Sequence, residues 1–553
     1  MVRFRPSNPV AAGVAILVAC ACAQAAAPTS YKFNFTSTPR TGYVSITPKS
    51  VFNTVNGFGW DFGSDTSVVW TAAMDGIEGR KSPANPYNWT GDPFYQPARD
   101  AFFFSAKVPA GNYELKITLG SKDTAVRATL RTEQRRLTIE DWKIAAGTSE
   151  TRVVHVNRRS DTIPGTKTLI GLTSREQSYI DLDDRLSIEF NGDHPVVQTL
   201  EIAPVDTDIT VWLCGHSTVV DQPQEPWGTW GMNFPRFFKA GVTISDQAES
   251  GLTSGSFISQ RRLDNIAGAL KTGDYVFVEF GHNDMKSTSA TKMDDFKTNL
   301  LKFVSTVKAK GATPVLVSPT ARLSFSGTTP VNTLESYPDS MKAVAAEQGI
   351  PLMDLNGFST AFIKALGPTN AYRAYTHFPA NTVPGQTAAL ADNTHWNDYG
   401  GYELARAMAT EVKRQNFAFA KFLSDDYSAF DPTKPDAYAT FALPFSPFLD
   451  TTFNPPDSAV TTMLSREEWS KSPLRIASAR FRNGTLALRV RSGEPGLEVR
   501  VVDADGTLEG RGFLGSDPDQ PTVVSSFHGW SNRVHLVEVV REGVIQDRVS
   551  VVP

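Results

Sequence analysis

The chain has 553 residues and a formal net charge of −4, and 41% of its residues are hydrophobic while 20% are charged. Its length accommodates several domains, and this balance of apolar and charged residues is typical of a globular protein. A slightly acidic chain offers no electrostatic attraction for nucleic acid or an anionic membrane surface, so we expect neither as a partner. The oligomeric state is not predictable from the sequence.

The N-terminus has the pattern of a secretory signal. Two arginines precede an apolar stretch from Val10 to Ala19, and small residues follow through Ala27. This order predicts a signal peptide over residues 1–27 and therefore a secreted or periplasmic protein. The apolar core is too short to cross a bilayer, so we expect no membrane span. Cys20 ends a segment that resembles a lipoprotein cleavage box, which leaves lipid anchoring as the alternative.

Residues 28–205 are rich in short β-type segments separated by turn residues. Examples are Ala101–Phe104, Tyr113–Ile117 and Leu186–Phe190. Such a succession predicts a β-sandwich of jelly-roll type. Two roles stay open for it: binding sugar, or shielding the domain that follows.

Residues 206–420 alternate between apolar runs and amphipathic stretches. Strands buried on both faces and joined by crossover helices predict an α/β domain with a parallel, doubly wound sheet. Functional sites in such domains form at the carboxyl ends of the strands. The expected strands are Ile209–Leu213, Val242–Ser245, Tyr275–Phe280, Pro314–Val317 and Pro351–Asp354, and the expected helices are Phe257–Leu270, Asp294–Lys310, Ser336–Gln348 and Asp398–Lys413.

The strand–helix alternation ends near residue 420. Residues 421–471 are rich in proline and predict a linker that wraps over the surface. Alternating segments resume with Leu486–Val490 and Leu497–Val502. We therefore expect a small antiparallel β-domain over residues 472–553, with no assigned function.

Four short polar segments stand at the ends of expected strands or in the last loop before the final helix. They are Gly215–Thr218, Ser250–Gly251, Gly281–Asp284 and Asp392–His395. Each alone has an ordinary explanation, such as a helix cap or a plain turn. Together they supply a nucleophile, oxyanion donors, and a base with its orienting carboxylate, which acyl transfer requires.

The chemistry assigns a role to each candidate. Ser217 is the candidate nucleophile and needs a base to accept its proton, for which His395 is the candidate. Asp392 would orient that imidazole, and a spacing of three places both side chains on one face of a turn or short helix. Gly251 offers a backbone N–H and Asn283 a side-chain amide as oxyanion donors.

At these segments the chain resembles the SGNH (GDSL-type) hydrolases, and within them the rhamnogalacturonan acetylesterase branch of carbohydrate esterases. The resemblance covers about residues 206–416, and the region before it is similar to the galactose-binding-like module ahead of bacterial members. The other segments that carry this resemblance are Ser217–Gln222, Trp230-Gly231, Asp246–Gly251, Gly273–Tyr275, Phe280–Asp284, Gly311–Val315 and Tyr337-Pro338.

The resemblance implies a flavodoxin-like parallel sheet and a Ser217, Asp392 and His395 triad. It also implies that Gly251 and Asn283 complete the oxyanion hole with the Ser217 amide. It implies no metal and no cofactor.

One position departs from the family pattern. The residue before the nucleophile is usually Asp in that family, and here it is His216. Because adjacent side chains on a sharp turn point apart, we do not expect His216 to be the base. His282 and Asp284 are expected to hold their loop in shape. Trp227 and Trp230 either stack on sugar rings or are buried by a helix; they are left outside the site.

The sequence therefore predicts a secreted serine esterase that removes acetyl groups from a plant cell-wall polysaccharide, with rhamnogalacturonan (pectin) favoured. The enzymatic alternatives are a lipase, thioesterase or acyltransferase on the same scaffold, or a xylan acetylesterase. The non-enzymatic alternative is a polysaccharide-binding protein whose hydrolase site has decayed.

Overall fold

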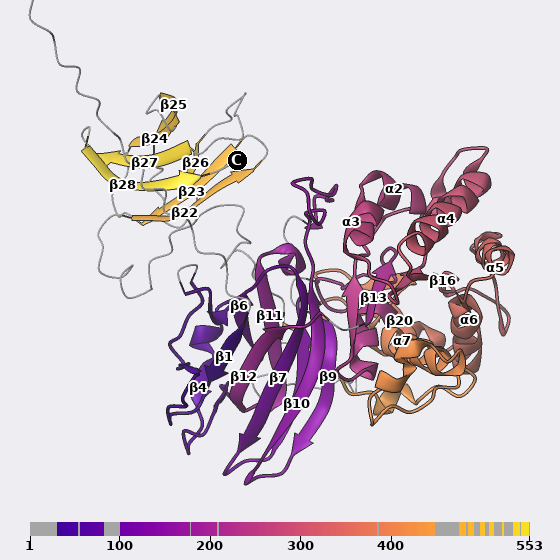
Figure 1. Cartoon of the computed structure of the whole chain (residues 1–553), viewed down its shortest axis with the longest axis horizontal. Coiled ribbons are helices and arrows are strands. Elements are labelled where there is room, and N and C mark those ends of the chain that lie inside the picture. Colours follow the sequence, from indigo (N-terminus) through magenta and orange to yellow (C-terminus); the bar gives the residue numbers. More distant parts are fainter. Residues whose placement is uncertain are drawn as a thin grey trace, which may run out of the picture.

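The structure is a computed structural model of the whole chain (Figure 1). The predicted signal peptide and Cys20 lie outside the residues that it describes. Those residues are 30–53, 56–81, 100–176, 179–206, 209–383, 386–447 and, as backbone only, a set of strands between 475 and 551.

Two sheets fill the region from residue 31 to 204. One has seven strands, with β10-β7-β12-β1-β2 in order, β5 paired with β12 and β4 paired with β5. The other has the order β3-β6-β11-β8-β9. The sheets share one hydrophobic core: Phe33 of the first packs on Phe104 of the second with ring centroids 4.9 Å apart. The strands are β1 (Tyr31–Asn34), β2 (Val44–Ser45), β3 (Phe58–Asp61), β4 (Val68–Trp70), β5 (Ile77–Gly79), β6 (Phe102–Lys107), β7 (Gly111–Ser121), β8 (Val126–Thr132), β9 (Arg136–Ile144), β10 (Thr148–Arg158), β11 (Arg185–Asp193) and β12 (Val197–Pro204).

The next region has a central sheet of five parallel strands in the order β14-β13-β15-β16-β19. This order, with the first strand between the second and the third, is that of a doubly wound sheet, which confirms the predicted parallel sheet. Apolar side chains on both faces bury it between two hydrophobic clusters. The strands are β13 (Ile209–Cys214), β14 (Val242–Asp246), β15 (Tyr275–Val278), β16 (Thr313–Val317) and β19 (Leu352–Met353).

Helices cover both faces of this sheet (Figure 1). Two short ribbons, β17 (Phe325–Ser326) with β18 (Thr329–Pro330) and β20 (Tyr375–Phe378) with β21 (Leu390–Trp396), lie outside it. The helices are α1 (Trp230–Asn233), α2 (Ser254–Ser259), α3 (Arg262–Ala269), α4 (Lys292–Lys308), α5 (Tyr337–Gln348), α6 (Leu355–Leu366) and α7 (Asp398–Arg414), with 3-10 turns η1 (Ser64–Thr66), η3 (Ile180–Leu182), η4 (Phe234–Phe237), η5 (Asp284–Lys286), η6 (Ala371–Ala374), η7 (Ala418–Phe422) and η8 (Tyr438–Thr440).

One expected helix is divided. The stretch 257–270 forms α2 and α3 with a break at Arg261, whose φ of 63° is left-handed. The next residue, Arg262, is buried and donates to both carboxylate oxygens of Glu176, at 2.7 and 2.5 Å. The break coincides with this contact to the preceding region. The amphipathic periodicity of the stretch could not predict the break, because the contact is with a distant part of the chain.

Buried ion pairs join the two regions. Arg136 of β9 donates to one Asp221 oxygen from two nitrogens, at 2.9 and 2.6 Å, and Arg135 lies 2.7 Å from Glu225. All four side chains are at most 5% exposed. Asp221 stands four residues after Ser217, so these pairs hold the β-rich region against the chain that follows the candidate nucleophile.

The described part of the predicted linker, residues 421–447, packs on the α/β region. Phe430, Leu443 and Phe445 belong to one of the two hydrophobic clusters that flank its sheet. The Pro444 carbonyl also accepts a hydrogen bond from Arg131 of β8. This segment therefore contacts both preceding regions.

The C-terminal strands pair antiparallel in two sheets, β22-β23-β26 and β25-β24-β27-β28. Within the described residues, no helix has both the length and the apolar character needed to cross a membrane. The strands are β22 (Arg475–Arg482), β23 (Thr485–Arg491), β24 (Glu498–Asp503), β25 (Leu508–Phe513), β26 (Thr522–Val524), β27 (His535–Arg541) and β28 (Val544–Val551).

Candidate active site

Ser217 lies on a tight turn that directly follows β13. The His216 carbonyl accepts from the amides of Val219 and Val220, at 2.9 and 3.0 Å, which closes the turn. Glycine is required at residue 215, because a Cβ there would lie 2.5 Å from Val219 Cγ2. The tight turn thus places the half-buried Ser217 side chain at the carboxyl end of β13, the first strand of the parallel sheet.

Ser217, His395 and Asp392 form a continuous hydrogen-bonded series. The distance from Ser217 Oγ to His395 Nε2 is 2.8 Å, and that from His395 Nδ1 to Asp392 Oδ2 is 2.6 Å. Each imidazole nitrogen therefore has one partner, as base catalysis by a serine–histidine–carboxylate set requires. The structure brings together all three residues expected to form the triad.

The Asp392 carboxylate is held in its ionised form. Burial is the largest single influence and acts to raise its pKa. The hydrogen bond and charge of His395, together with bonds from the amides of Thr394 and His395 at 2.8 and 3.0 Å, outweigh burial in sum. The result is a pKa of about 2, against 3.8 for an ordinary Asp. The orienting carboxylate is thus charged at neutral pH and stabilises an imidazolium on His395.

The local backbone of Asp392 and His395 differs from the expected turn or short helix. Both lie on strand β21, which pairs with β20. The pairing passes from Asp392 opposite Thr376 directly to Trp396 opposite Tyr375, so the intervening residues form a bulge. The bulge brings the two side chains onto one side despite the period of two in a regular strand.

Besides the Ser217 amide, two oxyanion donors are expected, Gly251 and Asn283, and they are joined through Leu252. Asn283 donates one amide hydrogen to the Leu252 carbonyl at 3.0 Å, and its Oδ1 accepts from Lys286 at 2.8 Å. An amide nitrogen carries two hydrogens, so one remains for a ligand. Gly251 has a φ of 84°, and its N–H has no acceptor among the residues that the structure describes.

The loops that carry these donors are fastened to their surroundings. Asp284 accepts from Gly281 N at 3.1 Å and from the amide and hydroxyl of Ser254 at 2.9 and 2.5 Å. The Glu249 amide donates to the Gly215 carbonyl at 3.3 Å, which links the Gly251 loop to the nucleophile turn. The expected role of Asp284 in shaping its loop is confirmed.

Sequence reasoning missed Arg175, which comes from the β-rich region. Its Nη2 donates to the Ser250 carbonyl at 2.5 Å and to the buried Glu249 carboxylate at 3.0 Å. Ser250 C=O and Gly251 N–H belong to the same peptide unit, so Arg175 holds the peptide that carries an expected oxyanion donor. No local signal marks it, because the partners lie 75 residues apart in a different region.

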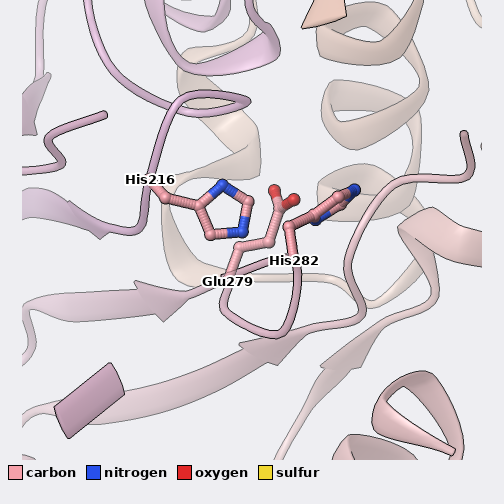
Figure 2. A group of neighbouring side chains, drawn as sticks. All are labelled: His216, Glu279 and His282. Carbon is pink, nitrogen blue, oxygen red and sulfur yellow. The ribbon is translucent and has the colours of Figure 1, made fainter. Parts of the chain in front are cut away.

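His216 is not the base: its ring is hydrogen-bonded to Thr218, and His395 is the imidazole that reaches Ser217 Oγ. His216 is fully buried beside Glu279 and His282, with its Nδ1 3.3 Å from Thr218 Oγ1 (Figure 2). Burial lowers the pKa of His216 to about 3, so the imidazole is neutral. The His282 ring interacts with the Thr320 backbone, without close hydrogen-bond geometry at either ring nitrogen, and packs edge-on against His216 with ring centroids 4.8 Å apart.

Glu279 is held by three neighbours. Thr218 and Trp230 donate to its two oxygens at 2.7 and 2.5 Å, and Thr320 N donates at 3.3 Å. Burial raises the pKa of Glu279 to about 7. Trp230 is thereby buried, at 1% exposure, so burial rather than sugar stacking is its role, while Trp227 is half-buried.

Comparison with known proteins places this geometry in a family. Residues 213–404 match the GDSL-like lipase/acylhydrolase family. The chain is 35% identical to rhamnogalacturonan acetylesterase RhgT of Bacillus subtilis (strain 168) over 208 residues, which is 37% of this chain and 90% of the relative. It is 25% identical to the uncharacterized esterase YxiM of the same strain over 402 residues, 71% of this chain and 94% of the relative.

The crystal structure of YxiM matches 70% of this chain and 99% of its own, with 22% identity and a TM-score of 0.36. The family match and the likeness to RhgT agree with the hydrogen-bonded series at Ser217. The chain therefore belongs to the GDSL-like lipase/acylhydrolase family and is a carboxylic ester hydrolase with rhamnogalacturonan acetylesterases among its relatives.

Proposed function

We propose that this protein is an exported serine esterase that removes acetyl groups from rhamnogalacturonan. The observation that carries the proposal is the hydrogen-bonded series from Ser217 Oγ through His395 to Asp392, with distances of 2.8 and 2.6 Å. Export rests on the predicted signal peptide over residues 1–27.

In the first half-reaction, Ser217 Oγ bonds to the acetyl carbonyl carbon while His395 Nε2 takes the hydroxyl proton. The carbonyl oxygen becomes an oxyanion, which the Gly251 N–H and the second Asn283 amide hydrogen stabilise. The tetrahedral intermediate then collapses: the bond from carbon to the sugar oxygen breaks, and His395 returns the proton to that oxygen. The products are the free sugar hydroxyl and acetyl-Ser217.

In the second half-reaction, water replaces the sugar. His395 takes a proton from the water as its oxygen attacks the acetyl-Ser217 carbonyl, and the same donors hold the oxyanion. Collapse releases acetic acid and restores the Ser217 hydroxyl with the proton from His395. Asp392 stays ionised throughout and stabilises each imidazolium.

Cationic side chains near these residues support a pectic substrate. Exposed Lys286 donates to Asn283, and the half-buried Arg322 donates to the His282 carbonyl at 3.4 Å and interacts electrostatically with Asp392. Rhamnogalacturonan carries uronate carboxylates, which such cations attract. An uncharged polysaccharide has no carboxylates and gains no such attraction. The relative RhgT is named a rhamnogalacturonan acetylesterase.

The β-rich region supports substrate delivery in this proposal. Its Arg175 contacts the Ser250 carbonyl, and its Arg136 pairs with Asp221 after the nucleophile turn. We therefore propose that it acts as a galactose-binding-like module that positions a polysaccharide chain beside Ser217 as well as fastening the site.

The test is acetate release from acetylated rhamnogalacturonan, homogalacturonan and xylan, with an uncharged small acetyl ester as reference. We expect the highest kcat/KM on rhamnogalacturonan. Added salt should lower kcat/KM on the two uronate polymers but not on the small ester. Equal or greater kcat/KM on xylan would contradict the pectic assignment. Failure of a serine-directed phosphonate to label Ser217 would instead favour a binding protein with a decayed site.

A further inference from the structure

Three buried side chains behind the nucleophile form a cluster that the ester hydrolysis does not use. His216 follows β13, Glu279 follows β15, and His282 lies in the next loop (Figure 2). Their exposures are 0%, 0% and 2%. One ring nitrogen of each histidine and one Glu279 oxygen all lie within 4.8 Å of one another.

The histidines of this cluster are short of hydrogen-bond partners. His216 Nε2 has none in the described part of the chain, and the His282 ring has only an interaction with the Thr320 backbone that lacks close hydrogen-bond geometry. Buried polar atoms are nearly always paired, so imidazole nitrogens that lack a well-formed bond on two adjacent rings indicate a bound species that pairs with them.

We propose that His216, Glu279 and His282 bind one divalent transition-metal ion, with zinc as the expected occupant. Two imidazoles and a carboxylate are a ligand set that zinc takes in proteins. Bonds of about 2.1 Å to such an ion put tetrahedral ligand atoms roughly 3.4 Å apart, so binding draws the three side chains closer together.

The existing contacts of Glu279 are compatible with this role. Thr218 and Thr320 N donate to Oε1, whereas Oε2 accepts only from Trp230 and can take a second bond. Hydrogen bonds of this kind orient a ligating carboxylate and hold it in place. The Asp that the family usually carries at residue 216 would offer a carboxylate oxygen, so His216 makes the ligand set of this chain richer in nitrogen.

The ion would tie two loops together rather than act on the ester. His216 is adjacent to Ser217, and His282 is adjacent to Asn283. Binding both histidines therefore fixes the nucleophile turn relative to the loop of an oxyanion donor. Metal content is measurable without turnover, so this inference stands or falls independently of the proposed function.

The test uses the untagged full chain carrying Ser217→Ala, equilibrated with zinc chloride and then dialysed against metal-free buffer. Mass spectrometry of zinc, iron, manganese, nickel and copper should find one ion per chain. His216→Asn and His282→Asn should each lose it, while His194→Asn, outside the cluster, should retain it. No stoichiometric ion in the parent, or full retention in both variants, would overturn the proposal.

X-ray absorption of the zinc-loaded parent decides the matter if either variant fails to fold. Nitrogen and oxygen neighbours near 2.0–2.1 Å with scattering from two imidazoles support the site. Absence of imidazole scattering would assign the ion elsewhere and contradict it.

Discussion

Arg175 donates a hydrogen bond of 2.5 Å to the backbone carbonyl of Ser250, across the boundary between the β-rich and α/β regions. The same peptide unit carries the Gly251 N–H. A cationic donor on the carbonyl fixes the plane of that peptide and polarises its N–H toward a developing negative charge. Under the proposed mechanism, the β-rich region thus supports an oxyanion donor through this contact.

Arg175→Ala should lower kcat on a small acetyl ester about 10-fold, or about 1.4 kcal/mol of transition-state stabilisation. KM should change little, because the held N–H acts on the oxyanion rather than on the bound ester. Arg175→Lys should recover part of the loss, since it keeps the charge but not the planar guanidinium. Steady-state kinetics measure both variants, and an unchanged kcat with a raised KM would count against the oxyanion role.

Asn283→Ala should lower kcat by roughly 10²–10³-fold with little change in KM, as removal of a side-chain oxyanion donor does. The matched control is Asn332→Ala, an exposed amide that donates to the Glu335 carbonyl. It should retain parental kinetics. Equal effects of the two substitutions would show that Asn283 acts only through folding.

Asp392 makes stability depend on pH. Its pKa falls from 3.8 to about 2 on folding, so its contribution is present above pH 4 and is lost as the pH falls toward 2. Asp392→Asn should therefore lower the free energy of unfolding at pH 6 but not at pH 2. Urea titrations of both proteins at several pH values test this, and a difference that grows on acidification would refute the sign.

The pair of Arg136 and Asp221 should matter for folding because both side chains are buried. Arg136→Met leaves the Asp221 carboxylate without its partner and should destabilise the protein by about 3–5 kcal/mol. Arg136→Met with Asp221→Leu should recover much of this loss, because no uncompensated charge remains. Urea unfolding measures the three proteins, and additive losses in the double variant would contradict the coupling.

The central part of the site was predictable from the sequence. Buried apolar runs predict parallel strands, and such strands present their carboxyl ends at one edge, which places Ser217 and Asn283 near each other. The bulge that aligns Asp392 with His395 was not predictable, since it depends on pairing with β20.

Long-range contacts account for the rest. Arg175 reaches Ser250 from a loop with no motif, and His216 meets His282 only through neighbouring strands β13 and β15. Neither contact leaves a periodic or local signal, because each depends on how separate regions pack. Turn chemistry did predict that His216 is not the base, and His395 is the imidazole within hydrogen-bond distance of Ser217 Oγ.

Ser217→Ala provides the most direct test of the proposed role of Ser217 as the nucleophile of the esterase. The quantity to measure is the rate of acetate release from acetylated rhamnogalacturonan, compared with the parent and with unfolding curves that establish a native fold. We expect the variant to stay folded and its rate of acetate release to fall by several orders of magnitude, because the covalent route through acetyl-Ser217 is gone. Release at the parental rate by the folded variant would contradict this role.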